Sequence, residues 1–146
     1  MKLGFEVWGR VSRPLSHVFR AVQNPKELER YFTTGGASAP LESGKTVTWD
    51  FADFPGKFPV KAKRVIKNKT IIIAWGSATG GNNDVLFKFK KISPRSTEVR
   101  ICESGWPNTP KGRKAAFGNC MGWSQMLAAL KAWCEHGINL RKGFYR

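Results

Sequence analysis

Few residues in this chain of 146 have the chemistry of a catalyst. His17 falls on the outer face of an expected helix and His136 at a helix end, so neither has the surroundings of a general base in a cavity. Glu103 differs from the other carboxylates because the alternation of its strand turns it inward beside Ile101. It is the one candidate acid or base. The alternatives are that Glu103 lies at a cavity mouth or pairs with a basic neighbour.

The three cysteines predict neither a disulfide framework nor a metal site. Cys102, Cys120 and Cys134 are odd in number, far apart and set in apolar patterns, which favours free buried thiols. No cluster of His, Cys or carboxylate side chains has the spacing of metal ligands, so we expect no metal and no cofactor.

A second set of residues has the composition of a ligand pocket. Its members alternate along several expected strands or recur on one face of an expected helix: Trp49, Phe51, Trp75, Phe87, Phe89, Ile101, Glu103, Trp123, Leu127 and Leu130. Ligand pockets are mostly apolar with a few placed polar groups, so these residues predict a cavity for an apolar or amphipathic small molecule. The alternative is that they only fill the core.

The opposite face of the same strands is basic. It carries Arg10, Lys61, Lys63, Lys67, Lys88, Lys90 and Arg100, in a chain with 25 Lys and Arg against 10 Asp and Glu and a net charge of +15. Such a face fits an acidic protein, nucleic acid or an anionic membrane surface, or it is only a solvated lysine face. The basic segments contain no helix-turn-helix, zinc-finger or aromatic RNP signature, which argues against sequence-specific DNA binding.

Hydrophobic periodicity predicts the elements that position these residues. Period-two alternation predicts strands over 3–11, 45–51, 58–67, 70–75, 85–92 and 97–103. Short helices are expected after Pro14 and from Asn24-Pro25, where Asn is a good cap and Pro suits the first helical position. The Gly-rich segment 33–44 predicts a loop. Apolar residues at helical spacing predict a long helix over 111–136, ended by Gly137.

These elements predict an α+β fold in which a curved six-stranded antiparallel sheet wraps around the long C-terminal helix. With 41% hydrophobic residues, a chain of this length can bury a core as one domain over residues 1–146. The chain has no run of 18 apolar residues, and its first residues lead directly into a strand. We therefore expect no transmembrane segment and a cytoplasmic location.

Several motifs in this order resemble a known family. They are Val11-Ser12-Arg13-Pro14, Val18-Phe19-Arg20-Ala21-Val22, Asn24-Pro25-Lys26-Glu27-Leu28, Leu41-Glu42-Ser43-Gly44-Lys45, Thr97-Glu98-Val99-Arg100-Ile101 and Gly122-Trp123. Together they resemble the family named for the activator of the heat-shock-protein-90 ATPase, in the lipid-transfer (START) and birch-pollen-allergen superfamily. The resemblance implies the helix-grip fold and a cavity between sheet and C-terminal helix. It does not imply a chaperone role.

The leading hypothesis is therefore a non-enzymatic domain that binds a small apolar or amphipathic molecule. The alternative is an interaction protein, like a chaperone cofactor, that holds an acidic protein or nucleic acid on its basic face. A third hypothesis is a small enzyme that uses Glu103.

Overall fold

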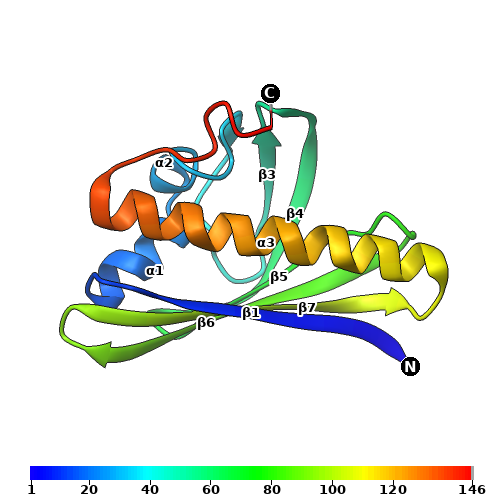
Figure 1. Cartoon of the computed structure of the whole chain (residues 1–146), viewed down its shortest axis with the longest axis horizontal. Coiled ribbons are helices and arrows are strands. Elements are labelled where there is room, and N and C mark those ends of the chain that lie inside the picture. Colours follow the sequence, from blue (N-terminus) through cyan, green and yellow to red (C-terminus); the bar gives the residue numbers. More distant parts are fainter. Residues whose placement is uncertain (146) are drawn as a thin grey trace.

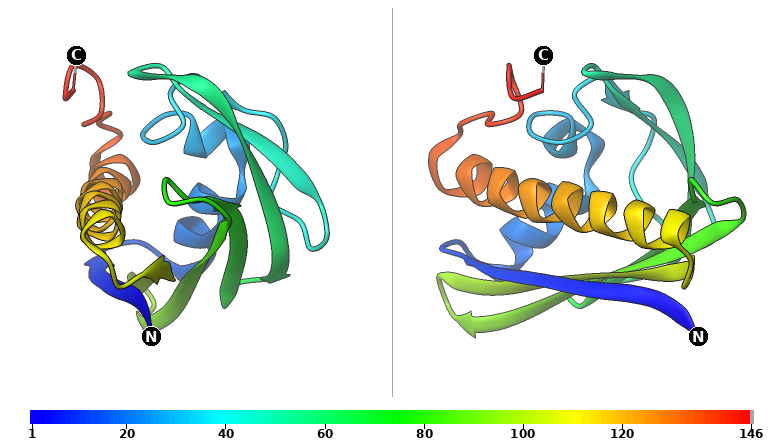
Figure 2. Two further views of the ribbon diagram at one scale, coloured as in Figure 1. Left: turned by 90° about the vertical axis from the view of Figure 1, so that its right-hand side faces the viewer. Right: turned by 45° about the vertical axis from the view of Figure 1, so that its right-hand side comes forward.

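The computed structural model describes the backbone of residues 1–145, and their side chains apart from that of Pro55. One seven-stranded antiparallel sheet, with strand order β1-β7-β6-β5-β4-β3-β2, curves around the long helix α3 (Figures 1 and 2). The strands are β1 (Lys2–Val11), β2 (Gly36–Ala37), β3 (Thr46–Phe51), β4 (Phe54–Ile66), β5 (Thr70–Gly76), β6 (Asn82–Ser93) and β7 (Ser96–Pro107). The helices are α1 (Leu15–Gln23), α2 (Pro25–Leu28) and α3 (Pro110–His136). The predicted α+β class and long C-terminal helix are confirmed.

The number of strands was predicted one too low. The additional strand, β2, lies in the expected loop and pairs with β3 through Gly36 opposite Asp50 and Ala37 opposite Trp49. Two residues are too few to give an alternating pattern, so periodicity could not reveal this strand.

Alternation along 58–67 predicts that Ile66 shares one face with Phe58, Val60 and Ala62, and for Ile66 this was wrong. The register of β4 against β5 shifts between Ala62 and Arg64, which reverses the alternation beyond that point. Val65 therefore packs against the core, whereas Ile66 pairs with Thr70 on the outer face.

The predicted start of α2 and the predicted end of α3 are confirmed by their caps. The side chain of Asn24 accepts a hydrogen bond from the backbone N–H of Lys26, with Pro25 at the start of α2. Gly137 adopts a left-handed conformation, with φ of 67°, directly after α3. The apolar residues Leu28, Tyr31 and Phe32 predict a helix from Asn24 to near Gly35, and this was wrong. The helix α2 ends at Leu28, and Tyr31 and Phe32 lie buried in the turns that follow it.

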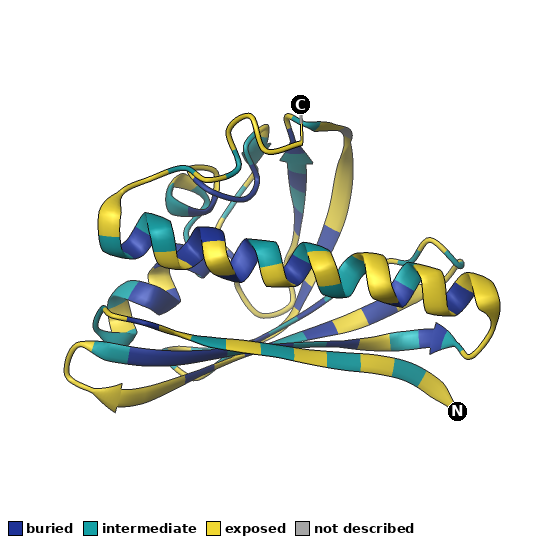
Figure 3. Cartoon of the chain, viewed as in Figure 1, coloured by how far each residue is buried: buried dark blue, intermediate teal, exposed yellow. Residues whose placement is uncertain are grey.

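The apolar stripe of α3 faces the concave side of the sheet (Figure 3). Ala116, Trp123, Leu127, Leu130 and Cys134 are buried along it. The prediction of three buried thiols holds only for Cys134, since Cys102 and Cys120 are partly exposed. None of the helices in residues 1–145 combines the length and apolar character needed to cross a membrane.

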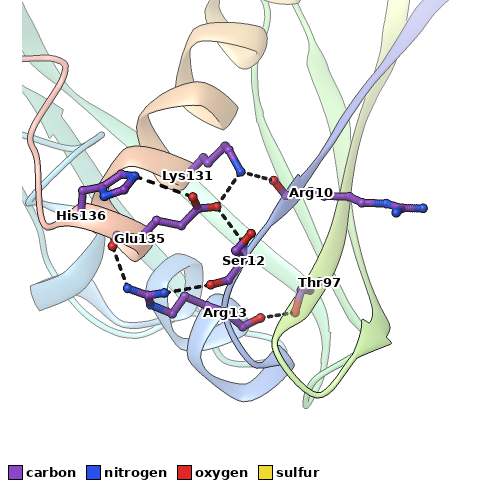
Figure 4. Close-up of polar contacts among 7 residues, drawn as sticks. All are labelled: Arg10, Ser12, Arg13, Thr97, Lys131, Glu135 and His136. Carbon is purple, nitrogen blue, oxygen red and sulfur yellow. Dashed lines mark hydrogen bonds and ion pairs between the residues drawn. The ribbon is translucent and has the colours of Figure 1, made fainter.

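The end of α3 is tied to the end of β1 by polar contacts (Figure 4). The carboxylate of Glu135 accepts from the backbone N–H of Ser12 at 2.7 Å, and its carbonyl oxygen accepts from Arg13 at 2.7 Å. Lys131 donates to the carbonyl oxygen of Arg10 at 3.0 Å. These contacts hold α3 across the sheet and thereby fix the distance between its stripe and the strands.

Candidate functional site

The aromatic residues predicted to face inward meet in one cluster between the sheet and α3. The ring of Trp123 lies 5.3 Å from that of Trp75, 5.4 Å from that of Phe87 and 5.5 Å from that of Phe32, between ring centroids. Trp49 joins through Phe32 and Trp75, at 5.6 and 6.0 Å. We call the following set the aromatic cluster: Phe32, Trp49, Phe51, Trp75, Phe87 and Trp123.

The remaining residues predicted for the cavity are also buried. Ile101, Leu127 and Leu130 belong to the same core. Phe89 lies in the core too, but its ring packs edge-on against Phe19 of α1, at 5.2 Å between centroids. Phe32, which contacts three members of the cluster, was missed because it lies in the irregular turns after α2.

Glu103 lies inside this core, with 1% of its surface exposed. Its oxygens accept hydrogen bonds from the indole N–H groups of Trp123 at 2.7 Å and Trp75 at 3.1 Å. The side-chain amides of Asn83 and Asn119 donate to it as well, at 3.1 Å and 3.0 Å. A side chain this buried does not lie at a cavity mouth, and no Lys or Arg of residues 1–145 forms an ion pair with Glu103, so neither alternative describes it.

These donors use the hydrogen-bonding capacity of the carboxyl group. Two carboxylate oxygens offer about four lone-pair sites, and the side chains of Trp75, Asn83, Asn119 and Trp123 occupy them. Hydrogen bonds of this kind offset the cost of taking a carboxyl group out of water. Glu103 therefore has no free acceptor for a substrate proton in this arrangement, and it holds the two indoles of the cluster in place.

Local sequence explains how the donors reach Glu103. Asn119 and Trp123 are four residues apart on α3, so both project from the same face of the helix. Gly105, with φ of 132°, leaves room for Asn83, whose side-chain amide would overlap a Cβ atom at that position. The helical spacing of Asn119 on the apolar stripe was a signal that could have revealed it. Asn83 lies beside a Gly-rich turn and gave no such signal.

Trp49 provides the unused polar group of the cluster. Its side chain is 1% exposed, and within residues 1–145 its indole N–H has no acceptor. Buried indole N–H groups usually find a partner, and an unpaired donor costs about 1–3 kcal/mol. The position of Trp49 beside Phe32 and Trp75 therefore leaves a donor available in an apolar environment.

Two hollows border the core. One of about 290 Å³ lies where β4 continues past the end of β5, and it is lined by Phe58 and Trp75 together with residues of the outer face, among them Thr46, Lys61 and Ala74. The other, of about 310 Å³, lies between α3 and the C-terminal residues, with Met121 and Phe144 in its walls. Between the two, the rings of the aromatic cluster are in contact with one another.

Most residues of the predicted basic face lie on the outer side, but Lys67 follows Ile66 beyond the register shift of β4, so the reversed alternation no longer places it on that face. Lys61, Lys63, Lys67, Lys88, Lys90 and Arg10 are exposed, and Arg100 is partly exposed. Two of these cations have carboxylate partners. Lys63 pairs with Asp84 at 2.8 Å, and Arg100 pairs with Glu6 at 2.7 Å and Glu98 at 3.1 Å.

Known proteins share this fold over nearly the whole chain. The model of the family described as "Activator of Hsp90 ATPase homolog 1-like protein" matches residues 12–135. SSP2350 from Staphylococcus saprophyticus is 25% identical, with a TM-score of 0.81 over 95% of this chain and 96% of that one. The chain has no match among the curated proteins compared.

Two further solved structures show the same fold at lower identity. The Aha1 dimer from Colwellia psychrerythraea is 19% identical, with a TM-score of 0.75 over 92% of this chain and 98% of that one. DynU16, a protein of the dynemicin biosynthetic locus, is 24% identical, with a TM-score of 0.77 over 92% of this chain and 48% of that one.

Proposed function

Because the chain belongs to the Activator of Hsp90 ATPase homolog 1-like family, whose fold commonly binds ligands, we propose that it binds an apolar or amphipathic small molecule between the sheet and α3. The single observation that carries the proposal is the unpaired N–H of Trp49 inside the aromatic cluster. An acceptor atom of a ligand would satisfy this donor, while the surrounding rings would contact the apolar part of the molecule.

The polar groups of the site restrict the chemistry of the ligand. Trp49 can only donate, so the ligand needs an acceptor such as a ketone, amide or hydroxyl oxygen. Trp75 contacts both Trp49 and Glu103, so an anionic group bound at Trp49 would lie near a second acidic group. The preferred ligand is therefore apolar with a neutral acceptor.

We assign the hollow beside Trp75 as the route by which a ligand enters the aromatic cluster. Trp75 is partly exposed there, and the adjoining part of β4 pairs only with β3. A ligand that enters by this route meets Trp75 first and Trp49 behind it. Burial of apolar area, at about 25 cal/mol per Å², would supply most of the affinity, and the hydrogen bond would add about 0.5–1.5 kcal/mol.

Affinity measurements on Trp49→Phe test this function. Small aromatic ketones and amides, and hydrocarbons of matching shape, are titrated into the wild type, Trp49→Phe and the control Trp8→Phe, with binding read by calorimetry. We expect Trp49→Phe to weaken ketone and amide binding by about 2- to 12-fold, the range of one hydrogen bond, and to leave hydrocarbon binding unchanged. Trp8 lies on the outer face, so its replacement should change neither.

Added salt separates this function from a purely electrostatic one. Apolar burial is not screened, so affinity should stay constant as ionic strength rises. Equal affinities of wild type and Trp49→Phe for the ketones, or failure of the wild type to bind any member of the series, would contradict the proposal.

A further inference from the structure

An exposed tryptophan stands on the outer face of the sheet, away from the aromatic cluster. Trp8 of β1 is 56% exposed, although large aromatic side chains usually lie inside a protein. The guanidinium of Arg100 on β7 lies 5.0 Å from the centre of its ring, a cation–π contact. Trp8 therefore has a fixed orientation at the surface.

Strand pairing places cations around this indole. Trp8 is opposite Arg100, and Arg100 is opposite Lys88 of β6, so the three share one row and one face. The neighbouring row contains Arg10 and Lys90, each opposite Glu98. Successive strands are about 4.8 Å apart, so the cations of each row lie within roughly 10 Å across the sheet. We call Trp8, Arg10, Lys88, Lys90 and Arg100 the Trp8 platform.

The charges of the Trp8 platform divide into two kinds. Arg100 is held by Glu6 at 2.7 Å and Glu98 at 3.1 Å, which fixes its guanidinium over the indole. Arg10, Lys88 and Lys90 form no ion pair with any carboxylate of residues 1–145, and all three are exposed. The platform therefore combines a held aromatic ring with cations that remain available to an anion.

We propose that the Trp8 platform binds single-stranded nucleic acid. One base stacks on the exposed indole of Trp8, and phosphates on either side bind Lys88, Lys90 and Arg10. Proteins that bind single strands without sequence preference combine these two elements, a basic surface that follows the backbone and aromatic rings on which bases stack. The platform lies on the opposite side of the sheet from the aromatic cluster, so this activity is independent of the small-molecule site.

The exposed ring favours a single strand over other polyanions. The bases of a duplex are already stacked and paired, so they cannot lie on Trp8. An acidic protein would use the cations of the platform but would leave the indole without a role. Binding to either would depend on charge alone.

Anisotropy of a labelled oligothymidylate of about 15 nucleotides tests the proposal, across a range of salt concentrations. We expect Trp8→Ala to weaken binding about tenfold, since stacking of one base on an aromatic ring has an effect of this order. Replacing both Lys88 and Lys90 by Glu should weaken it further and flatten the salt dependence, because each neutralised phosphate contributes about 0.7 to the slope on single strands.

Matched controls separate the platform from the overall charge. Lys111 and Lys114 are exposed on the first turns of α3, so replacing both by Glu changes the net charge equally and should have a much smaller effect. The proposal is overturned if Trp8→Ala binds the oligothymidylate as tightly as wild type, or if a duplex of equal length or poly-glutamate binds equally well. Small-molecule binding in Trp8→Ala should be unchanged, so failure here leaves the proposed function testable by itself.

Discussion

Glu103 is the residue on which the geometry of the aromatic cluster depends. An amide in its place would turn one NH₂ group toward the N–H donors of Trp75, Asn83, Asn119 and Trp123. We predict that Glu103→Gln lowers the free energy of unfolding by about 1.5–3 kcal/mol, the range for a disrupted hydrogen bond to a charged group. Urea denaturation measures the change.

Glu29 provides the matched control for this substitution. Its side chain is exposed at the end of α2, so Glu29→Gln should change stability by less than about 0.5 kcal/mol. A Glu103→Gln protein as stable as the wild type would show that the carboxyl group does not organise the two indoles.

The raised pKa values of two thiols predict that the protein loses stability at alkaline pH. Burial, followed by the nearby carboxylate of Glu27, raises the pKa of Cys134 to about 12. Burial and the hydrogen bond to Glu6 raise the pKa of Cys102 to about 11. Thiols of an unfolded chain ionise near pH 8.5, so above that pH the unfolded state gains a charge that the folded state resists, and stability falls.

The measurement is the urea midpoint from pH 7.5 to 9.5 for the wild type and a variant with Cys102→Ala and Cys134→Ala. We predict a smaller decline with pH in the variant, whatever its absolute stability. Equal declines would assign the alkaline sensitivity to other groups, among them the buried Tyr31, whose pKa burial raises well above its usual value.

At the scale of elements, the C-terminal residues after α3 are attached to the turn between β3 and β4. Arg141 donates to both carboxylate oxygens of Asp53, with 2.9 Å from Nε to Oδ2 and 2.9 Å from Nη2 to Oδ1. Its guanidinium also lies 4.8 Å from the ring centre of Phe51. Figure 1 shows the segment that follows α3, in red, running toward this turn. The pair therefore joins the wall of the 310 Å³ hollow to the sheet.

We predict a coupling energy of about 1.5–3 kcal/mol between Arg141 and Asp53, because both side chains are largely buried and the pair is bidentate. Arg141→Ala, Asp53→Ala and the double variant, measured by denaturation, give this value. Lys142→Ala is the control, since that side chain is exposed. Strictly additive single effects would contradict an energetic role for the pair.

The elements were predictable to the extent that their patterns are local. Alternation along the strands and the stripe of α3 indicated the sheet, the helix and the caps at Asn24 and Gly137. The bulge after Ala62 was not predictable, because a single extra residue in a strand has no signature in the composition. It nevertheless reverses the face of the sheet on which Ile66 lies. The Arg141–Asp53 pair joins positions 88 residues apart, a separation over which no periodic pattern extends.

At the scale of the whole molecule, most of the aromatic cluster followed from the sequence. Strand parity and helical spacing place Trp49, Trp75, Phe87 and Trp123 on facing surfaces. The same pattern does not say whether space remains between the rings, since that depends on side-chain rotamers and on residues such as Phe32 in irregular turns. Ligand binding therefore stays a prediction, which the unpaired Trp49 makes specific.

The two-dimensional NMR spectrum of the indole N–H groups tests ligand binding most directly. The chain has six Trp residues, and substitution to Phe assigns each signal. On titration with an aromatic ketone, we predict that the signal of Trp49 moves downfield as its N–H gains an acceptor, while that of Trp8 on the outer face stays in place. A stationary Trp49 signal under conditions in which calorimetry detects binding would contradict the proposed site.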